Sequence, residues 1–195
     1  MDSSSLYINM RIVAGRYKGR KLQAGKDLSI RPTTDRVKEY IFQILDEYIA
    51  GKDVVDIFAG SGSLGIEALS RGARHITFVE KSRKSIAVLE KNLAALEISH
   101  DQYTIIQQAA EMFVQANRRE FDIYLLDPPF AIEGLQILMD NLMRSRALGY
   151  RDLVIIEHEV SNPLALTSDI YELFKQKKMG RSLISFLQKT GEENE

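Results

Sequence analysis

Short apolar runs alternate with longer amphipathic segments along most of this chain, and this alternation constrains the fold more than any other feature. The apolar runs predict buried strands at 54–58, 75–80, 103–107, 121–126 and 153–157. The amphipathic segments predict helices at 63–71, 82–96, 109–118 and within 133–147. Strands separated by helices pair in parallel through right-handed crossovers, so the pattern predicts an α/β fold with an open, mostly parallel sheet.

The two ends of the chain depart from this alternation. Segments 170–176 and 182–189 have alternating character and meet near Gly180, which predicts an antiparallel strand pair at the C-terminal edge of the sheet. A helix is predicted after Thr34 or Asp35, either of which can be its N-cap, and its apolar stripe consists of Val37, Tyr40, Ile41, Ile44, Leu45 and Tyr48. We expect a basic N-terminal extension or β-hairpin at 1–32, one α/β domain at 33–190 and an acidic tail at 191–195.

The composition excludes several classes of protein. The 195 residues include no Cys, so a disulfide framework, a thiolate metal site and a cysteine nucleophile are all excluded. The three His lack the spacing of metal ligands, and we expect no metal. No apolar run approaches the ~18 residues of a membrane span, and residues 1–9 lack the features of a signal peptide. We therefore expect a soluble cytoplasmic protein.

Basic residues are concentrated near the N-terminus. The formal net charge of the chain is -1, which argues against binding of nucleic acid through uniform positive charge. Between Arg11 and Lys38, however, nine basic and two acidic residues give +7, and the rest of the chain carries -8. Three glycines in this segment favour short strands and turns over a helix. A small β-appendage with a basic face is predicted to contact phosphate groups, and an ordinary solvated surface is the alternative.

A glycine-rich loop at 56–65 connects the first predicted sheet strand to the first crossover helix. Gly60, Gly62 and Gly65 match the G-x-G-x-x-G pattern of nucleotide-binding folds, and Glu80 ends the next strand, 20 residues after Gly60. Such a loop lies at the carboxyl edge of the sheet, where an acidic side chain can hold ribose hydroxyl groups. The loop therefore predicts a nucleoside-binding site, and a tight structural turn is the alternative.

Asp56, at the start of this loop, favours one class of cofactor. A carboxylate beside the glycine turn repels a pyrophosphate but suits a ligand with a cationic ammonium group. S-adenosylmethionine presents such an ammonium, together with a carboxylate and a ribose, so Asp56 favours it over NAD. The cofactor-binding residues predicted at this edge are Asp56, Phe58, Gly60, Ser61, Gly62, Glu80, Lys81 and Ala110.

The sequence Asp127-Pro128-Pro129-Phe130 follows the most apolar predicted strand and indicates the chemistry. Two prolines cannot continue a sheet, so they fix an extended turn at the same ligand-binding edge. The Asp127 carboxylate and the Pro128 carbonyl would then accept the N–H groups of an exocyclic amine, whose lone pair is otherwise delocalised into its base. Phe130 would stack on that base, and Asp127 could accept the released proton. These four residues are the predicted catalytic residues; a proline-terminated strand with Phe130 in the core is the alternative.

Together these motifs resemble those of a known family, the RsmD-type bacterial methyltransferases, which modify the N2 amine of a guanine in small-subunit (16S) ribosomal RNA. The resemblance covers nearly the whole chain from Met10. The run Arg-Pro-Thr-Thr-Asp-Arg at 31–36 is its most specific part, and the full set of motifs lies at 10–15, 19–22, 31–39, 56–65, 67–73 and 127–130.

The resemblance implies a fold, a cofactor site and a substrate. The fold would be the Rossmann-like sheet of class I S-adenosylmethionine-dependent methyltransferases, and the substrate would be RNA within a 30S particle or assembly intermediate. A basic appendage on a neutral body suits that substrate, because the neutral body limits non-specific trapping on other nucleic acid. Gln108-Ala109-Ala110 departs from the family pattern at the adenine site, where backbone groups or Gln108 would take over. The RNA-binding residues expected are Arg11, Arg16, Lys18, Arg20, Lys21, Arg31, Thr33, Thr34 and Arg36.

Three other functions are compatible with parts of the sequence. An Asp-Pro-Pro-aromatic sequence also serves N6-adenine DNA methyltransferases, although this short chain leaves little room for a domain that reads DNA sequence. A non-catalytic RNA-binding assembly factor on the same scaffold would not need Asp56, Glu80 and Asp127 to be intact. An NAD-dependent oxidoreductase would need a hydride-transfer site, and none accompanies the glycine loop.

Overall fold

A seven-stranded mixed sheet forms the centre of the computed structural model, which describes residues 10–24, 34–129, 132–161, 163–165 and 170–190. The strand order is β5-β4-β3-β6-β7-β9-β8. Neighbours from β5 to β7 pair in parallel, whereas β9 pairs antiparallel with both β7 and β8. The strands are β3 Asp53–Ile57, β4 His75–Glu80, β5 Tyr103–Gln107, β6 Ile123–Leu126, β7 Leu153–Glu159, β8 Tyr171–Met179 and β9 Ser182–Lys189.

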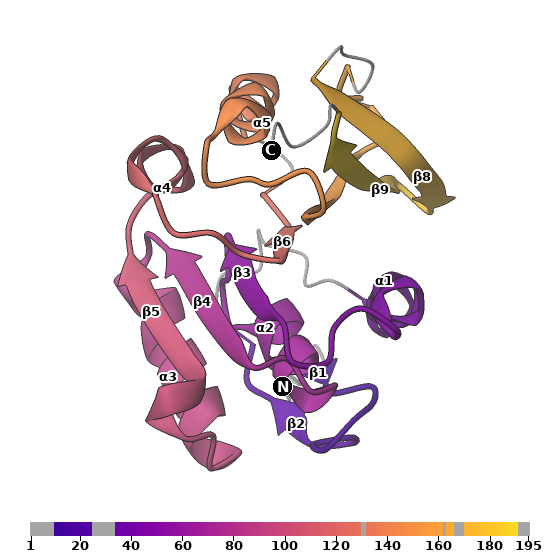
Figure 1. Cartoon of the computed structure of the whole chain (residues 1–195). Coiled ribbons are helices and arrows are strands. Elements are labelled where there is room, and N and C mark those ends of the chain that lie inside the picture. Colours follow the sequence, from indigo (N-terminus) through magenta and orange to yellow (C-terminus); the bar gives the residue numbers. More distant parts are fainter. Residues whose placement is uncertain (1–9, 25–33, 130–131, 162, 166–169, 191–195) are drawn as a thin grey trace, which may run out of the picture.

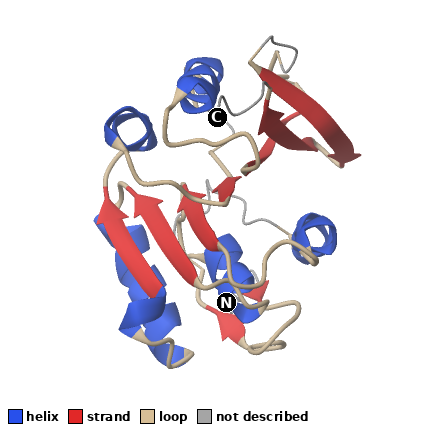
Figure 2. Cartoon of the chain, viewed as in Figure 1, coloured by secondary structure: helices blue, strands red, loops and turns tan. Residues whose placement is uncertain are grey.

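Helices cover both faces of this sheet (Figure 1 and Figure 2). α1, α2 and α3 pack on one face, and α4 and α5 pack on the other. The helices are α1 Asp35–Leu45, α2 Ser63–Ser70, α3 Arg83–Ala95, α4 Ala110–Ala116 and α5 Leu135–Arg144, with a 3-10 turn η1 at His100–Gln102. The molecule is a three-layer α/β/α structure, which confirms the fold class predicted from the alternation of strands and helices.

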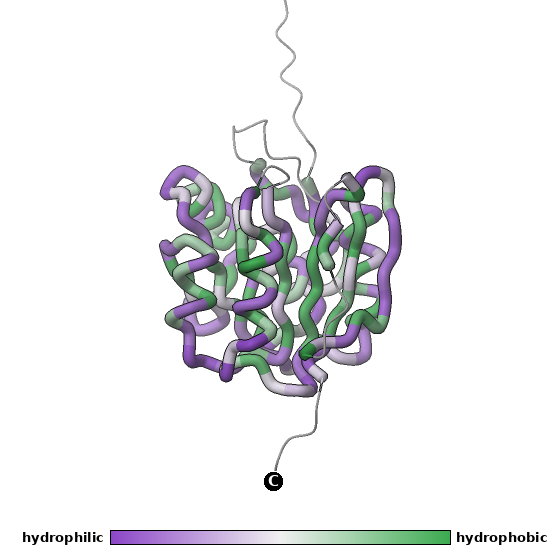
Figure 3. The backbone as a smooth tube through the Cα atoms, turned by 90° about the horizontal axis from the view of Figure 1, so that it is seen from above, coloured by the Kyte–Doolittle hydropathy of each residue, from purple (hydrophilic) through white to green (hydrophobic). Residues whose placement is uncertain are grey.

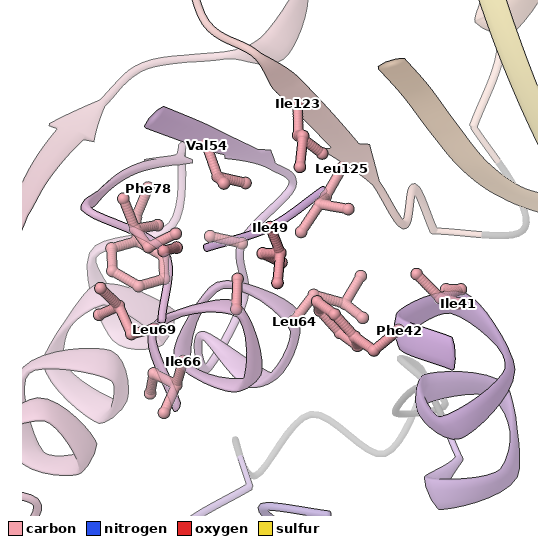
Figure 4. Close-up of a cluster of buried hydrophobic side chains, with 14 of the residues drawn as sticks. Ile41, Phe42, Ile49, Val54, Leu64, Ile66, Leu69, Phe78, Ile123 and Leu125 are labelled. Carbon is pink, nitrogen blue, oxygen red and sulfur yellow. The ribbon is translucent and has the colours of Figure 1, made fainter. Parts of the chain in front are cut away.

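Successive strand residues face opposite helical layers, as the two-residue period of a strand requires. In β3, Val54 belongs to the core on the side of α1 to α3, whereas Val55 belongs to the core beneath α4 and α5. Figure 4 shows Val54 and Leu125 of the sheet facing the helix that carries Leu64. Apolar residues follow the central strands and hydrophilic residues the outer surface (Figure 3). Each fully buried Val or Leu contributes roughly 1.5–3 kcal/mol, so the two cores hold the sheet rigidly between its helices.

A short antiparallel ribbon, β1 (Met10–Arg11) and β2 (Lys21–Leu22), packs on the side of α2 and α3 that faces away from the sheet (Figure 1). Met10, Ile12 and Leu22 are buried in the same core as α1, α2 and α3. The ribbon and the α/β domain therefore share one core.

Buried polar groups on α2 attach this N-terminal segment. The Glu67 carboxylate, fully buried, accepts hydrogen bonds from the N–H groups of Val13 (2.7 Å) and Ala14 (2.9 Å). A Cβ atom on Gly15 would lie 1.9 Å from the carbonyl oxygen of Ser70, so only glycine permits this close approach. Glu67 and Ser70 thus fix the path of the segment by bonds to its backbone.

The first helix agrees with its predicted start but not with its whole predicted stripe. Thr34 is the N-cap of α1, and its hydroxyl accepts a hydrogen bond from the N–H of Val37 (3.4 Å). The helix ends at Leu45, and Tyr48, predicted to be part of the apolar stripe, lies beyond it with 56% exposure. Lys38, absent from the predicted stripe, is buried because its ammonium donates to the carbonyl of Arg11. Burial lowers the pKa of Lys38 despite the nearby carboxylates.

The predicted antiparallel strand pair near the C-terminus is confirmed, with one strand longer than expected. β8 and β9 pair antiparallel on either side of Gly180. β8 continues to Met179, three residues past its predicted end, because the polar run at 175–178 has no alternation that marks a strand. None of the helices in the described part of the chain is long and apolar enough to cross a membrane.

Candidate active site at the carboxyl edge of the sheet

The glycine-rich loop and the Asp127-Pro128-Pro129 segment leave neighbouring parallel strands at the same level. Ile57 ends β3 and is paired with Val79 of β4 on one side and Leu126 of β6 on the other. Adjacent strands lie about 4.8 Å apart, so the residues that follow these three begin side by side at the carboxyl edge: Phe58, Glu80 and Asp127. The strand order reverses direction between β3 and β6, and such a switch point is where open α/β sheets bind ligands.

The first turn of the glycine loop combines a strained residue with open space. Phe58 has φ +71°, which is unusual for a residue with a side chain, and its N–H donates to the carbonyl of Val79 (3.1 Å). Gly60 has φ +55°, and among the described residues a Cβ atom placed on it would meet only the Phe58 carbonyl oxygen, at 3.9 Å. The backbone at Gly60 is therefore open to a close approach by a ligand.

The two later glycines of the loop have a packing role. A Cβ atom on Gly62, which has φ +87°, would lie 2.3 Å from a methyl group of Leu89 in α3. One on Gly65 would lie 2.3 Å from the ring of Phe78 in β4. These glycines let α2 lie close to the sheet and to α3, and the predicted contact of Gly62 with a cofactor stays a prediction.

Glu80 lies directly beside this loop. One oxygen of its carboxylate accepts a hydrogen bond from the N–H of Gly60 (2.9 Å) and the other from the N–H of Ser82 (2.8 Å). The side chain is partly exposed. Each carboxylate oxygen has capacity for a further donor, so Glu80 can accept ribose hydroxyl groups without giving up these bonds.

Asp56 points into the protein. Its carboxyl group is 1% exposed and accepts a hydrogen bond from the N–H of Gly65 (2.9 Å), in the first turn of α2. Burial raises the pKa of Asp56 to about 7, opposed by the Gly65 hydrogen bond and reinforced by the charge of Glu80. The structure thus gives Asp56 a partner inside the protein, and the predicted contact with a cofactor ammonium stays a prediction.

The predicted catalytic segment, residues 127–130, begins where β6 ends. Asp127 is partly exposed, Pro128 is buried and Pro129 is exposed. The carbonyl of Pro129 accepts a hydrogen bond from the N–H of Ile132 (3.0 Å). Phe130 lies outside the described residues.

The remaining predicted cofactor residues surround the same edge. Ser61 lies in the glycine loop, and Lys81 follows Glu80 and is exposed. Ala110 is the buried first residue of α4, two residues after Gln108, whose N–H donates to the carbonyl of Glu80 (3.2 Å). The structure therefore gathers the predicted cofactor and catalytic residues that it describes around the ends of β3, β4, β5 and β6.

The predicted RNA-binding residues are divided between two places. Arg11 donates to the carboxylate of Asp35 (2.7 Å) beside the start of α1, where Thr34 and the exposed Arg36 also lie. The turn at 14–20 instead contacts Ser70 and Ala95, the last residues of α2 and α3. Because crossover helices run back from the carboxyl edge, this turn lies toward the amino edge.

The turn carries three of the predicted RNA-binding cations. Arg16, Lys18 and Arg20 are all exposed, and Lys21, at the start of β2, is exposed as well. The structure does not bring this group to the two loops of the candidate site. Arg31 and Thr33 lie outside the described residues.

Two polar residues of this region were not predicted from the sequence. The Ser63 hydroxyl, in the first turn of α2, is buried and has no hydrogen-bond partner among the residues that the structure describes. Asn92 in α3 is buried, and its side-chain amide donates to the carbonyl groups of Ser61 (2.9 Å) and Gln23 (3.1 Å). Asn92 therefore joins the N-terminal segment to the glycine loop, a link over long sequence separation that no local pattern reveals. No group of three or more His, Asp or Glu side chains in the described ranges is placed to hold a metal ion.

Comparison with known proteins agrees with this geometry. The family model described as Conserved hypothetical protein 95 matches residues 10–188. The chain is 39% identical over 173 residues to ribosomal RNA small subunit methyltransferase D of Haemophilus influenzae, covering 88% of this chain and 89% of that protein. Its identity to the Escherichia coli K12 protein of the same name is 35% over 172 residues, covering 88% and 86%.

A solved structure supports the same relationship. A protein from Escherichia coli superimposes with a TM-score of 0.81 at 32% identity, covering 94% of this chain and 99% of that one. The family model and the two sequence relatives each span most of the chain, including both segments of the candidate site. The chain therefore belongs to the RsmD family, whose model carries the description Conserved hypothetical protein 95.

Proposed function

We propose that this protein transfers a methyl group from S-adenosylmethionine to the exocyclic N2 amine of a guanine in small-subunit (16S) ribosomal RNA. Membership of the family and the names of its relatives support a methyltransferase that acts on ribosomal RNA. The observation that carries the proposal is the register that starts the glycine loop and Asp127 side by side on β3 and β6. The names of the relatives do not specify the modified atom, so the guanine N2 amine is proposed in addition to what those names support.

The residues at the carboxyl edge suit S-adenosylmethionine as cofactor. The open backbone at Gly60 and the Glu80 carboxylate beside it offer polar groups at the start of the loop. Gly60 and Ser61 would hold the amino-acid part of the cofactor, and Glu80 would hold its ribose. When bound, S-adenosylmethionine supplies an electrophilic methyl group.

Asp127 and the Pro128 carbonyl orient the amine. An exocyclic amine of guanine is a weak nucleophile because its lone pair is delocalised into the base. Two acceptors that hold its two N–H groups favour a pyramidal nitrogen and direct the lone pair away from the ring. As the new N–C bond forms, the nitrogen becomes more acidic, and Asp127 accepts the proton that it loses.

The substrate base would reach this site by leaving its stack. Asp127 lies at a sheet edge and is only partly exposed, so a base within an RNA helix cannot place its amine there. Extrusion of the base requires a few kcal/mol, and stacking on an aromatic ring returns ~1–3 kcal/mol. Phe130, which follows Pro129 in the sequence, is the ring that we assign to this role.

A methyl-transfer assay with three substrates tests the proposal. Tritiated S-adenosylmethionine is incubated with 30S particles, with naked 16S ribosomal RNA and with duplex DNA, and the labelled nucleoside is identified after digestion. The proposal predicts N2-methylguanosine from a ribosomal substrate, with the particle preferred. Label on adenine of duplex DNA would instead establish the DNA methyltransferase. Calorimetry that detected no binding of S-adenosylmethionine would indicate a non-catalytic scaffold.

A further inference from the structure

We infer that the carboxyl half of β8 and its turn to β9 form a second RNA-contacting surface, which holds the phosphate backbone next to the target base. This β8 basic surface consists of Lys175, Lys177, Lys178, Arg181 and the ring of Phe174. The inference rests on the proposed function, because it assigns the same RNA substrate to a further part of the molecule.

The first observation is the concentration of charge. Residues 170–190 contain five basic residues and one acidic residue, a net charge of +4, whereas residues 39–169 carry -8. All four cations of the surface are exposed, and β8 is drawn mostly in the hydrophilic colour in Figure 3. None of the ion pairs found within the described ranges involves any of the four. Their charge is therefore available to a phosphate.

The second observation is the position of this charge relative to Asp127. Across the sheet, Leu126 is paired with Ile156, Ile156 with Ser185 and Ser185 with Gln176. The next residue toward the carboxyl edge on β6 is Asp127, and on β8 it is Lys177. Three strand spacings of about 4.8 Å separate them, so Lys177 lies about 14 Å from the catalytic segment at the same level. This distance suits contact between Lys177 and the phosphates of the nucleotides on either side of an extruded base.

The third observation is that aromatic rings lie among these cations. Phe174 is 43% exposed and lies where a register shift interrupts the pairing of β8 with β9. Its ring centroid is 6.1 Å from that of Phe186, and the Tyr40 ring of α1 is 6.0 Å from Phe186 on another side. The ammonium of Lys177 lies 4.4 Å from the centre of the Tyr40 ring. Phe186 is buried and Tyr40 is partly buried, so Phe174 is the exposed ring of these three. An exposed ring between cations is typical of surfaces that bind single-stranded nucleic acid.

Helix α1 extends this surface toward the predicted RNA-binding residues. Arg36 is exposed and precedes Tyr40 by four residues, so the two lie on one side of the helix. The cations of β8 therefore continue through Tyr40 to Arg36 and the start of α1. The amino-edge turn with Arg16 and Lys18 is not part of this continuous surface.

Lysines on an edge strand can also serve only to prevent pairing with another molecule. Two features favour RNA contact over that role. The cations are concentrated at the carboxyl half of β8, whereas the amino half carries Glu172 and the buried Tyr171. In addition, an exposed Phe174 would promote the association that edge lysines are meant to prevent.

The test compares two triple variants that remove the same charge. One is Lys175→Gln, Lys177→Gln and Lys178→Gln; the control is Lys84→Gln, Lys91→Gln and Arg151→Gln, exposed cations on other parts of the surface. Affinity for naked 16S ribosomal RNA is measured over a series of salt concentrations, together with calorimetric binding of S-adenosylmethionine and methyl transfer to 30S particles. We expect the first variant to lower the slope of log affinity against log salt by about 2, since each lost phosphate contact removes about 0.7–0.9. Its KM for RNA should rise at least 10-fold with little change in kcat or in cofactor binding, whereas the control should match the wild type.

A slope and a KM equal to those of the wild type, in a first variant that stays monomeric, would overturn the inference. Aggregation of that variant with unchanged RNA affinity would also overturn it, in favour of edge protection. If the triple variant folds poorly, Phe174→Leu replaces it. We then expect weaker RNA binding with an unchanged salt slope, because stacking releases no counterions, and unchanged affinity would contradict the inference. Failure of the wild type to methylate any ribosomal RNA is a different result, and it would overturn the proposed function itself.

Discussion

At the scale of single residues, Asp56 shows how a motif residue can have a structural role. Asp56 is 1% exposed, and its carboxyl group accepts a hydrogen bond from the N–H of Gly65 in the first turn of α2. The pKa of Asp56 is about 7, above the usual 3.8. Between these two pH values the folded protein therefore retains a proton that the unfolded chain releases. Asp56 therefore makes the stability of the fold depend on pH.

Replacement of Asp56 by Asn should remove this dependence. Because the folded pKa is raised, the contribution of Asp56 to stability falls as pH rises from about 4 to about 7 and is constant above. Between pH 5 and pH 8, the free energy of unfolding of the wild type should decrease relative to that of Asp56→Asn by on the order of 2–3 kcal/mol. Urea denaturation of both proteins at the two pH values measures the difference, and parallel changes would show that Asp56 ionises normally.

Asp127 tests the catalytic assignment without disturbing the glycine loop. Asp127→Ala removes an acceptor for the target amine, so methyl transfer to 30S particles should decrease by about 10²–10⁴-fold. Calorimetric binding of S-adenosylmethionine should change little, because Asp127 follows β6 whereas the glycine loop follows β3. Asp127→Asn is the matched control of similar size. Unchanged turnover in the Ala variant would remove Asp127 from the mechanism.

The sequence predicted the motif residues but not the polar residues that hold them. Gly60, Glu80 and Asp127 were recognised because each follows a strand, and strand ends of a parallel sheet share an edge. Ser63 and Asn92 were missed, since their importance comes from burial and from partners far away in the chain. The inward direction of Asp56 was also beyond prediction, because a residue type does not specify which way its side chain turns.

At the scale of elements, Glu67 attaches the N-terminal segment to α2. Besides Val13 and Ala14, its carboxylate accepts a hydrogen bond from Arg71 (2.9 Å). Glu67→Gln keeps the volume but turns an amide toward these donors, so we expect a loss of about 2–4 kcal/mol in the free energy of unfolding. Denaturant unfolding measures it, and hydrogen exchange at the Val13 and Ala14 amides should become faster.

Glu90 on α3 provides the control for this change. It is exposed, so Glu90→Gln should alter stability by no more than about 0.5 kcal/mol. An equal, small effect of both substitutions would show that the segment is held by its apolar residues alone.

The cations of the amino-edge turn make a separate prediction. Neutralisation of Arg16, Lys18, Arg20 and Lys21 should weaken RNA binding and reduce its salt dependence, as each lost phosphate contact removes counterion release. Since the turn lies away from the catalytic edge, kcat at saturating RNA should not change. Affinity measured over a range of salt concentrations checks this, and an unchanged slope would exclude the turn from the RNA interface.

The bounds of two strands agree with the predicted segments. β4 is a central strand with four buried residues and a clear apolar pattern, and β5 matches its predicted bounds although it lies at the edge of the sheet. The predicted stripe of α1 failed at Tyr48, because the helix had already ended, and at Lys38, because its stem is buried while its ammonium reaches a backbone carbonyl. β8 lies at the edge of the sheet and most of its residues are exposed, so its sequence lacks the alternation of apolar and polar residues that marks a half-buried strand.

At the scale of the whole molecule, positive charge is concentrated in the N-terminal segment and in the hairpin of β8 and β9. Along the sequence, a stretch of net charge -8 at 39–169 lies between the basic N-terminal segment and the basic β8 hairpin. In the fold, the β8 basic surface lies level with Asp127 at the carboxyl edge, whereas the turn at 14–20 lies toward the amino edge. The proposed RNA substrate would therefore be held next to the target base by the β8 basic surface and the start of α1, while the acidic body repels other nucleic acid.

The most direct test of the whole account is mass mapping of ribosomal RNA from cells that lack this protein. The account predicts the loss of one N2-methylguanosine from small-subunit ribosomal RNA. A plasmid copy of the wild type should restore the modification, and Asp127→Ala should not. A complete set of methylated guanines in the deleted strain, or restoration by Asp127→Ala, would contradict the account.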